Sequence, residues 1–154
     1  MKSRILSTIT LFSLAFALLI ITPDYVSSQT SGCDPIFVPL TYNQTISDEI
    51  NGQFWSFSYC FNGNAGDIVN ISMNATSGDL DTYLELSDSK RIKLIDNNNI
   101  DQNSKNSLIQ YTLPTTGAYY ISASRSDGVT GTTSGGFSLT LNSSTSGSTQ
   151  QGRP

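Results

Sequence analysis

Apolar and polar residues alternate through most of the chain, in short runs rich in β-branched and aromatic side chains. Val69, Ile71 and Met73, for example, alternate with the polar residues Asn70 and Ser72. A period of two residues places one set of side chains on a buried face and the other on an exposed face. Clusters of Gly, Asn, Asp and Ser separate the runs, and none of the runs has the period of a helix. The pattern therefore predicts β-strands joined by turns.

The alternation predicts about eight strands. They are expected at residues 36–42, 53–61, 67–73, 81–88, 91–96, 106–112, 118–125 and 136–142. Besides the three named above, the residues expected to face the core are Trp55, Phe57, Tyr59, Phe61, Thr82, Leu84, Leu86, Ile92, Leu94, Tyr119, Ile121, Ala123, Phe137, Leu139 and Leu141. This arrangement is typical of an all-β fold, an antiparallel β-sandwich of jelly-roll type.

The start of the chain has the organisation of a secretory signal peptide. Lys2 and Arg4 precede an apolar run at 5–21, and small residues follow around a cleavage site after Ser28. A transmembrane anchor is the alternative, because the run lies at the lower limit of a membrane span. The Ser and Thr residues within the run and the cleavage site favour the signal peptide.

We therefore expect a signal peptide at 1–28, a β-sandwich domain at 29–142 and a tail at 143–154. The tail is rich in Ser, Thr and Gly and has no apolar residue, which is typical of disorder. Cleavage leaves six basic and eleven acidic residues, a net charge of −5, which argues against nucleic acid as a partner. The leader predicts a secreted, extracellular protein with no membrane attachment after cleavage.

Cys33 and Cys60 are the two cysteines of this exported chain. Disulfides persist outside the cytoplasm, so a Cys33–Cys60 bridge is favoured, and closing that loop stabilises the fold by roughly 3 kcal/mol. The alternative is lipidation of Cys33, since Thr30-Ser31-Gly32 before it faintly resembles a bacterial lipobox. That segment lacks the usual Leu and lies far beyond the apolar run, and lipidation would leave Cys60 unpaired.

The composition argues against catalysis. The chain has no histidine, which removes Ser-His-Asp and Cys-His arrangements and His-ligated metal sites. Asp79, Asp81 and Glu85 lie close together in the sequence, but a glycosidase needs two carboxyl groups across a cleft, one with a raised pKa. These three are interpreted as surface carboxylates flanking a strand.

Two segments are rich in oxygen donors that suit calcium. Asp79 and Asp81 share one side of a strand entry, and a loop downstream carries Asp96, Asn98 and Asp101. Calcium takes six to eight oxygen ligands, which two adjacent loops of this kind can supply. The alternative is that these residues only form turns, because Asp and Asn commonly do so.

Three aromatic residues lie out of phase with the predicted core. Phe54, Tyr83 and Tyr120 alternate with inward-facing residues, so we expect them to face solvent. An exposed aromatic ring is rigid and loses little entropy on contact, which suits the binding of sugars or extended protein segments. The alternative is that they are scattered surface aromatics without a function.

Short motifs follow one another in order along residues 46–141. They are Ala-Gly-Asp-Ile-Val at 65–69, Gly-Asp-Leu-Asp-Thr-Tyr-Leu-Glu-Leu at 78–86, Asn-Ser-Leu-Ile-Gln-Tyr-Thr-Leu-Pro at 106–114, Thr-Gly-Ala-Tyr-Tyr-Ile at 116–121 and Ser-Gly-Gly-Phe-Ser-Leu-Thr-Leu at 134–141. Together they resemble the bacterial pre-peptidase C-terminal domain. Members of that family are secreted jelly-roll β-sandwiches, typically appended to extracellular peptidases. The distantly similar collagen-binding modules of clostridial collagenases bind calcium.

The resemblance implies a role beside a catalytic partner, although we expect no peptidase fused ahead of this domain. It carries no set of metal ligands onto particular residues of this chain. The sequence thus predicts a secreted, non-catalytic accessory or binding module that contacts an extracellular polysaccharide or protein through an outer sheet face. The alternative is a structural or secretion-assisting domain with no ligand of its own.

Overall fold

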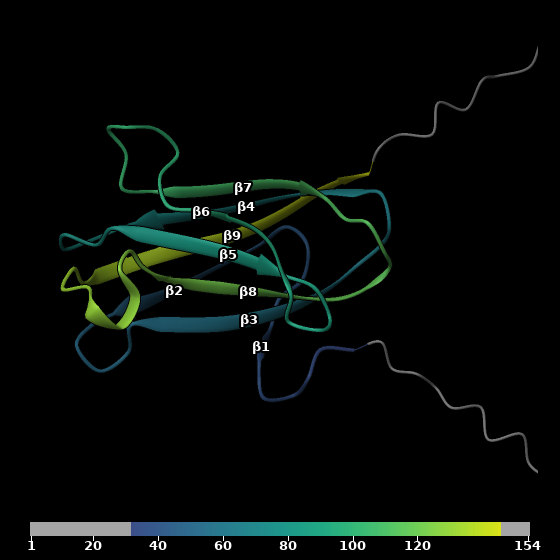
Figure 1. Ribbon diagram of the computed structural model, residues 1–154, viewed down its shortest axis with the longest axis horizontal. Coiled ribbons are helices and arrows are strands. Elements are labelled where there is room, and N and C mark those ends of the chain that lie inside the picture. Colours follow the sequence, from purple (N-terminus) through teal and green to yellow (C-terminus); the bar gives the residue numbers. More distant parts are fainter. Residues whose placement is uncertain (1–31, 146–154) are drawn as a thin grey trace, which may run out of the picture.

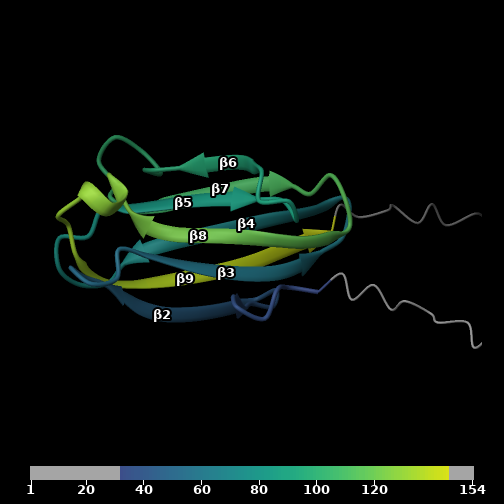
Figure 2. The same cartoon turned by 60° about the horizontal axis from the view of Figure 1, so that its bottom comes forward.

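The computed structural model describes residues 32–145, which form two β-sheets stacked face to face (Figures 1 and 2). The predicted signal peptide and residues 146–154 lie outside the described residues. The five-stranded sheet contains β1 (Val38–Pro39), β3 (Ser56–Gly63), β8 (Gly117–Arg125), β5 (Thr82–Ser87) and β6 (Lys93–Asn97), in that spatial order. The four-stranded sheet contains β2 (Gln44–Ile50), β9 (Gly135–Thr145), β4 (Asp67–Ala75) and β7 (Ser107–Thr112).

The strand order is that of a jelly roll. Successive strands from β2 to β9 alternate between the two sheets, except for β5 and β6, which form a hairpin. β8 lies between β3 and β5, and β9 lies between β2 and β4, always antiparallel to its neighbours. Within the described residues the only helix is a 3₁₀ turn, η1 (Gly128–Thr130). The predicted all-β sandwich of jelly-roll type is therefore confirmed.

The core fills the space between the sheets with the residues that the alternation predicts. Val69, Ile71 and Met73 of β4 are buried. From the opposite sheet they meet the inward-facing residues of β3, β5 and β8. The predicted core residues that are fully buried are Tyr59, Phe61, Thr82, Leu84, Leu86, Tyr119, Ile121, Ala123, Phe137, Leu139 and Leu141. Because these side chains point inward, their neighbours in sequence point away from the core, and this positions the site described below.

The core positions predicted for Trp55 and Ile92 are wrong, because β3 and β6 begin later than predicted. Trp55 precedes β3 and is 40% exposed. Ile92 precedes β6 and is also exposed, because Arg91 before it has a positive φ of 64° and belongs to the β5–β6 turn. Phe57 and Leu94 lie at the margin of the core and are only partly buried.

The N-terminal half contains two further differences. The predicted strand at 36–42 shortens to the two residues of β1. β2 was not predicted, because Ile46 and Ile50 are the only apolar residues in an otherwise polar edge strand. β9 in turn continues past the expected domain boundary at 142.

Candidate functional site

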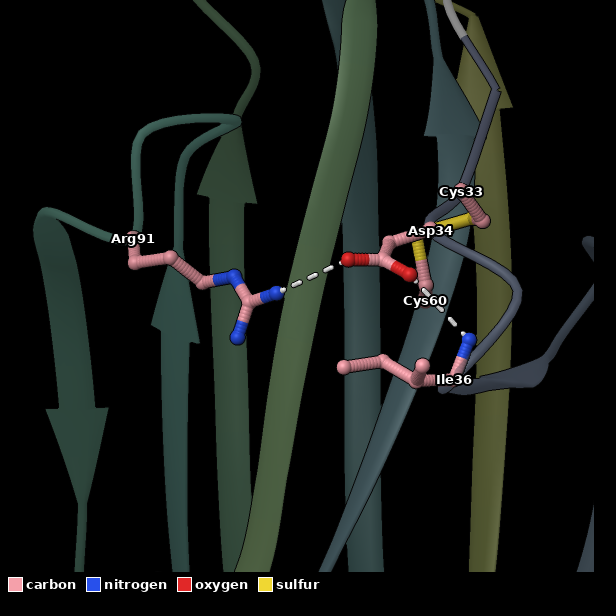
Figure 3. The surroundings of a disulfide bond; sticks show 5 residues. All are labelled: Cys33, Asp34, Ile36, Cys60 and Arg91. Carbon is pink, nitrogen blue, oxygen red and sulfur yellow. Dashed lines mark hydrogen bonds and ion pairs between the residues drawn. A yellow bond between two sulfur atoms is a disulfide. The ribbon is translucent and has the colours of Figure 1, made fainter.

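A disulfide joins the segment before β1 to the middle of β3. The Cα atoms of Cys33 and Cys60 lie 5.5 Å apart, bonded through their sulfur atoms as predicted (Figure 3). The Leu40 N–H donates to the Cys60 carbonyl at 2.8 Å, and β1 pairs with β3 in parallel. Because disulfides persist in oxidising compartments, this bond indicates an extracytoplasmic location.

The residues from Cys33 to Pro39 form a strap along the edge of the five-stranded sheet, which we call the N-terminal strap. It begins with a turn in which the Asp34 carbonyl accepts from the Phe37 N–H at 3.0 Å. Asp34 Oδ1 accepts from the Ile36 N–H at 3.2 Å, and Asp34 Oδ2 lies 3.6 Å from an Arg91 guanidinium nitrogen. Figure 3 shows Arg91 pointing from the β5–β6 turn toward Asp34. The ion pair thus connects the strap at the β1 edge of the sheet with the turn between β5 and β6.

Phe37, Arg91 and Tyr120 form a compact cluster beneath that ion pair. The ring centroids of Phe37 and Tyr120 lie 4.8 Å apart in an edge-to-face arrangement. The guanidinium carbon of Arg91 lies 4.1 Å from the Phe37 centroid and 4.3 Å from the Tyr120 centroid. Cation–π contacts of this kind stabilise by about 0.5–1 kcal/mol when exposed.

The β5–β6 turn presents Arg91 in a strained conformation. Asp88 Oδ1 accepts from the N–H groups of Lys90 and Ile92, at 2.8 and 2.9 Å, and the Arg91 N–H donates to the Asp88 carbonyl at 2.9 Å. These bonds hold Arg91 in the left-handed region, which glycine and asparagine adopt more readily. A non-glycine residue held there, with its side chain in a cluster, is a pointer to function.

A pocket of about 150 Å³ opens beside this cluster on the outer face of the five-stranded sheet. Its floor is a row of neighbouring outward residues, in which Ser58 of β3 is opposite Ser122 of β8, and Ser122 is opposite Glu85 of β5. The residues that line the pocket are Phe37, Ser58, Glu85, Ser87, Arg91, Tyr120, Ile121 and Ser122. The floor therefore carries two hydroxyl groups and the Glu85 carboxylate, and the walls include Phe37, Arg91 and Tyr120.

The structure brings Tyr83 and Tyr120 onto this same outer face. They lie on the adjacent strands β5 and β8. Tyr120 is opposite Ser87 and Tyr83 is opposite Ser124, so the two tyrosines flank the row formed by Ser122 and Glu85. Both side chains are half-buried.

The hydroxyl of Tyr83 is fixed by a carboxylate. It donates to Asp96 Oδ2 at 2.9 Å, and burial together with this bond raises the pKa of Tyr83 to about 12. Asp96 also pairs with Lys93 at 3.0 Å, and these two partners hold the pKa of Asp96 below its usual range. Asp96 lies opposite Glu85 on the neighbouring strand, and like charges in that position are unfavourable. The face thus keeps a carboxylate at the pocket despite this cost.

Phe54 does not belong to this face. It lies in the loop before β3 and is 52% exposed, as expected for an out-of-phase residue. Its ring lies 6.2 Å from that of Phe57, which in turn lies 5.8 Å from Phe137 of the core. Phe54 therefore extends the margin of the core and lies away from the two tyrosines.

The predicted calcium ligands are only partly brought together. The loop after β6 does reach the strand that follows Asp81, since Ser107 Oγ lies 2.7 Å from the Asn98 carbonyl oxygen and 2.8 Å from the Thr82 carbonyl oxygen. Asp101 Oδ1 accepts from the Asn103 N–H within a local turn, whereas Asp79 Oδ1 accepts from the Ser134 N–H in the segment before β9.

Asp81 and Asp96 differ in what their carboxylates contact. Asp81 Oδ1 is buried and has no hydrogen-bond donor among the described residues, whereas Asp96 is occupied by Lys93 and Tyr83. Across residues 32–145 no three Asp, Glu or Cys side chains gather as metal ligands. Calcium binding through Asp79, Asp81, Asp96, Asn98 and Asp101 stays a prediction.

The sequence contains a signal for only part of this outer-face site. Tyr83 and Tyr120 were found because they are out of phase with their strands. Phe37 and Arg91 were missed, since both fell inside predicted strands and reach the site only through the strap and a turn.

Among residues 32–145, the structure contains no apolar helix of the length that a membrane span requires.

Residues 56–125, from the start of β3 to the end of β8, match the family model of the bacterial pre-peptidase C-terminal domain. The predicted resemblance to this family is therefore confirmed over residues 56–125. A search of curated proteins found no match.

Solved structures show the same fold. The pre-peptidase C-terminal domain of a collagenase from Bacillus anthracis is 18% identical, with a TM-score of 0.55, and the match covers 68% of this chain and 93% of that one. PliG from Salmonella Typhimurium, a periplasmic inhibitor of g-type lysozyme, is also 18% identical, with a TM-score of 0.50 and coverage of 70% and 96%. Neither likeness transfers a partner to this chain.

Proposed function

We propose that this protein is a secreted, non-catalytic module that binds an extracellular polymer, a polysaccharide or a protein, through the outer face of its five-stranded sheet. The observation that carries the proposal is the placement of Tyr83 and Tyr120 on adjacent strands of that face, on either side of the polar row formed by Ser122 and Glu85. Two rigid amphipathic rings separated by hydroxyl groups make a flat contact surface for an extended chain.

The surroundings of the pocket support binding rather than chemistry. Glu85 is the one carboxylate that lines it, and a glycosidase needs a pair flanking the scissile bond. The serine hydroxyls at the pocket have no histidine to activate them, since the chain contains none. These residues are suited to hold a ligand by hydrogen bonds and ring contacts.

The solved relatives are compatible with more than one use of the fold. The Salmonella protein inhibits a lysozyme, so a sandwich of this kind serves there in binding another protein. The Bacillus anthracis domain is part of a collagenase, which supports a role beside a hydrolase. A structural or secretion-assisting domain without a ligand is the alternative.

The test replaces both tyrosines and compares the result with a matched aromatic outside the face. We expect the double variant Tyr83→Ala/Tyr120→Ala to lose binding to a polymer that the parent protein binds with a micromolar or weaker Kd. Phe54→Ala is the control and should bind like the parent. Binding is measured by affinity electrophoresis for polysaccharides and by surface plasmon resonance for proteins. A panel without any binder would favour the structural alternative.

A further inference from the structure

We propose that the pocket between the N-terminal strap and β5 is a subsite for one sugar residue of a neutral polysaccharide. The inference rests on the proposed function and names its ligand class. Three observations carry it: the presence of both donors and acceptors around the pocket, the compensation of its positive charge, and its size.

The pocket offers both kinds of hydrogen-bonding group at once. Glu85 accepts and the Arg91 guanidinium donates, while the hydroxyls of Ser58 and Ser122 do either. Glu85 is already bonded to Ser87, Ser122 to Ser56, and Arg91 to Asp34. A sugar ring carries hydroxyls that also donate and accept, so it can add hydrogen bonds to the lone pairs and N–H groups that these side chains still offer. Its C–H faces suit an aromatic wall, which Tyr120 supplies here.

The positive charge at the pocket is compensated before any ligand arrives. Arg91, the basic side chain that lines the pocket, is paired with Asp34, whereas Glu85 keeps its negative charge and accepts from the Ser87 hydroxyl at 3.2 Å. The whole chain has a net charge of −4, which disfavours approach of a polyanion. These features favour an uncharged ligand over an acidic polysaccharide.

A side chain of a partner protein fits the same groups less well. A basic side chain would approach Arg91, and an acidic one would approach Glu85. An apolar side chain would remove water from Glu85 and Ser58 without replacing their hydrogen bonds, which is costly. The observations therefore favour a ligand rich in hydroxyl groups, as a polysaccharide is, over a charged or apolar protein side chain.

The dimensions fit one ring with the polymer continuing beyond it. About 150 Å³ is below the range of roughly 300–1,000 Å³ found for drug-sized ligands. On β5, Ser87 is opposite Tyr120, and Tyr83 lies four residues before Ser87, with Glu85 between them. Four residues of strand correspond to about 13 Å. A chain with one residue in the pocket can thus place a residue further along the polymer against Tyr83.

The experiment compares ligand classes and pocket variants. The intact exported protein is tested by affinity electrophoresis against neutral polysaccharides (a β-glucan, a mannan and a galactan), acidic ones (pectate and alginate) and gelatin as an extended protein. Glu85→Gln keeps the shape but weakens the acceptor. Arg91→Lys keeps the charge but loses the planar group. Lys90→Ala, in the same turn and outside the pocket, is the matched control.

We expect retention by at least one neutral polysaccharide, weakened about tenfold or more by Glu85→Gln and by Arg91→Lys and unchanged by Lys90→Ala. Near-ultraviolet circular dichroism checks that each variant keeps the parent fold. Neutral binding that both pocket variants leave intact would overturn the inference. So would binding confined to pectate, alginate or gelatin, although loss of that binding in Tyr83→Ala/Tyr120→Ala would leave the proposed function standing. Failure to bind any polymer would overturn both.

Discussion

Phe37 of the N-terminal strap lies edge-to-face on Tyr120 of β8, with ring centroids 4.8 Å apart. This contact depends on more than the two rings, because the strap has little apolar burial of its own. Ile36, next to Phe37, is 78% exposed. The Cys33–Cys60 bond fixes the start of the strap to β3, so the disulfide positions one wall of the pocket.

The first prediction concerns this disulfide. Cys33→Ser/Cys60→Ser should lower the free energy of unfolding by roughly 3 kcal/mol, and it should weaken polymer binding because Phe37 and Asp34 are no longer held. Urea denaturation and affinity electrophoresis measure the two effects. Intact mass of the exported protein should show a chain starting at Gln29 and lacking two hydrogens. Free thiols, or an acyl chain on Cys33, would contradict the assignment.

The second prediction separates the backbone strain at Arg91 from its side-chain contacts. Arg91→Ala and Arg91→Gly both remove the guanidinium from Phe37 and Tyr120. Only glycine adopts the φ of 64° without cost, so the glycine variant should be more stable than the alanine variant by about 1 kcal/mol. Both should bind polymer less well than the parent. Equal midpoints in urea for the two variants would show that the turn is not strained.

The sequence predicted the sandwich well because its core rests on a local pattern. In β4 the alternation alone places Val69, Ile71 and Met73 in the core. The sequence does not predict β2, because an edge strand needs few apolar residues and Ile46 and Ile50 alone do not form an alternating apolar run.

The site was less predictable because its parts meet through long-range contacts. Tyr83 and Tyr120 each lie out of phase on their own strand, which the sequence reveals. Arg91 reaches the pocket because a hairpin turn holds it with a positive φ, and Phe37 because a disulfide folds the strap onto β3. Neither cause leaves a periodic signal in the neighbouring residues.

The third prediction concerns calcium, which we propose binds near Asp81. Its Oδ1 is buried without a donor among the described residues, and a cation there would supply the missing partner. Millimolar calcium should then raise Tm by several degrees relative to a chelator, by mass action on the native state. Asp81→Asn should remove the difference, whereas Asp127→Asn, in an exposed turn, should not. Superimposable melts of the parent protein in calcium and in chelator would contradict a calcium site at Asp81.

The fourth prediction concerns acid stability. Asp67 Oδ2 accepts from the Asn64 N–H at 3.0 Å and from the Tyr42 hydroxyl at 2.8 Å, and these bonds hold the pKa of Asp67 below its usual value. A carboxyl whose pKa is lower in the folded state stabilises the fold above its unfolded pKa of about 4. That contribution is lost as the pH falls through the folded pKa.

Asp67→Asn should therefore destabilise the protein by about 1–3 kcal/mol at pH 7, and the gap to the parent should narrow below about pH 4. Tyr42→Phe removes one donor, so it should raise the pKa of Asp67 and move the acid-unfolding midpoint to higher pH. Urea midpoints measured from pH 2 to pH 7 test both variants. A constant gap between Asp67→Asn and the parent across that range would contradict the assignment.

The fifth prediction compares two tyrosines that are equally buried but differently bonded. Tyr59 and Tyr119 are each 1% exposed. The Tyr119 hydroxyl donates to the Thr115 carbonyl at 2.6 Å, whereas the Tyr59 hydroxyl has no hydrogen-bond partner among the described residues. Burial, with a smaller contribution from the charge of Asp48, raises the pKa of Tyr59, so this hydroxyl stays neutral and unpaired in the core.

Removing an unpaired buried hydroxyl relieves a desolvation cost, while removing a bonded one leaves its acceptor unsatisfied. Tyr59→Phe should therefore leave the free energy of unfolding unchanged or raise it by about 1 kcal/mol. Tyr119→Phe should lower it by about 1 kcal/mol or more, because the Thr115 carbonyl loses its donor. Both variants keep the aromatic ring, so packing is matched and urea denaturation reports the hydroxyl alone. A Tyr59→Phe variant as destabilised as Tyr119→Phe would mean that the Tyr59 hydroxyl has a partner, such as a buried water molecule, in solution.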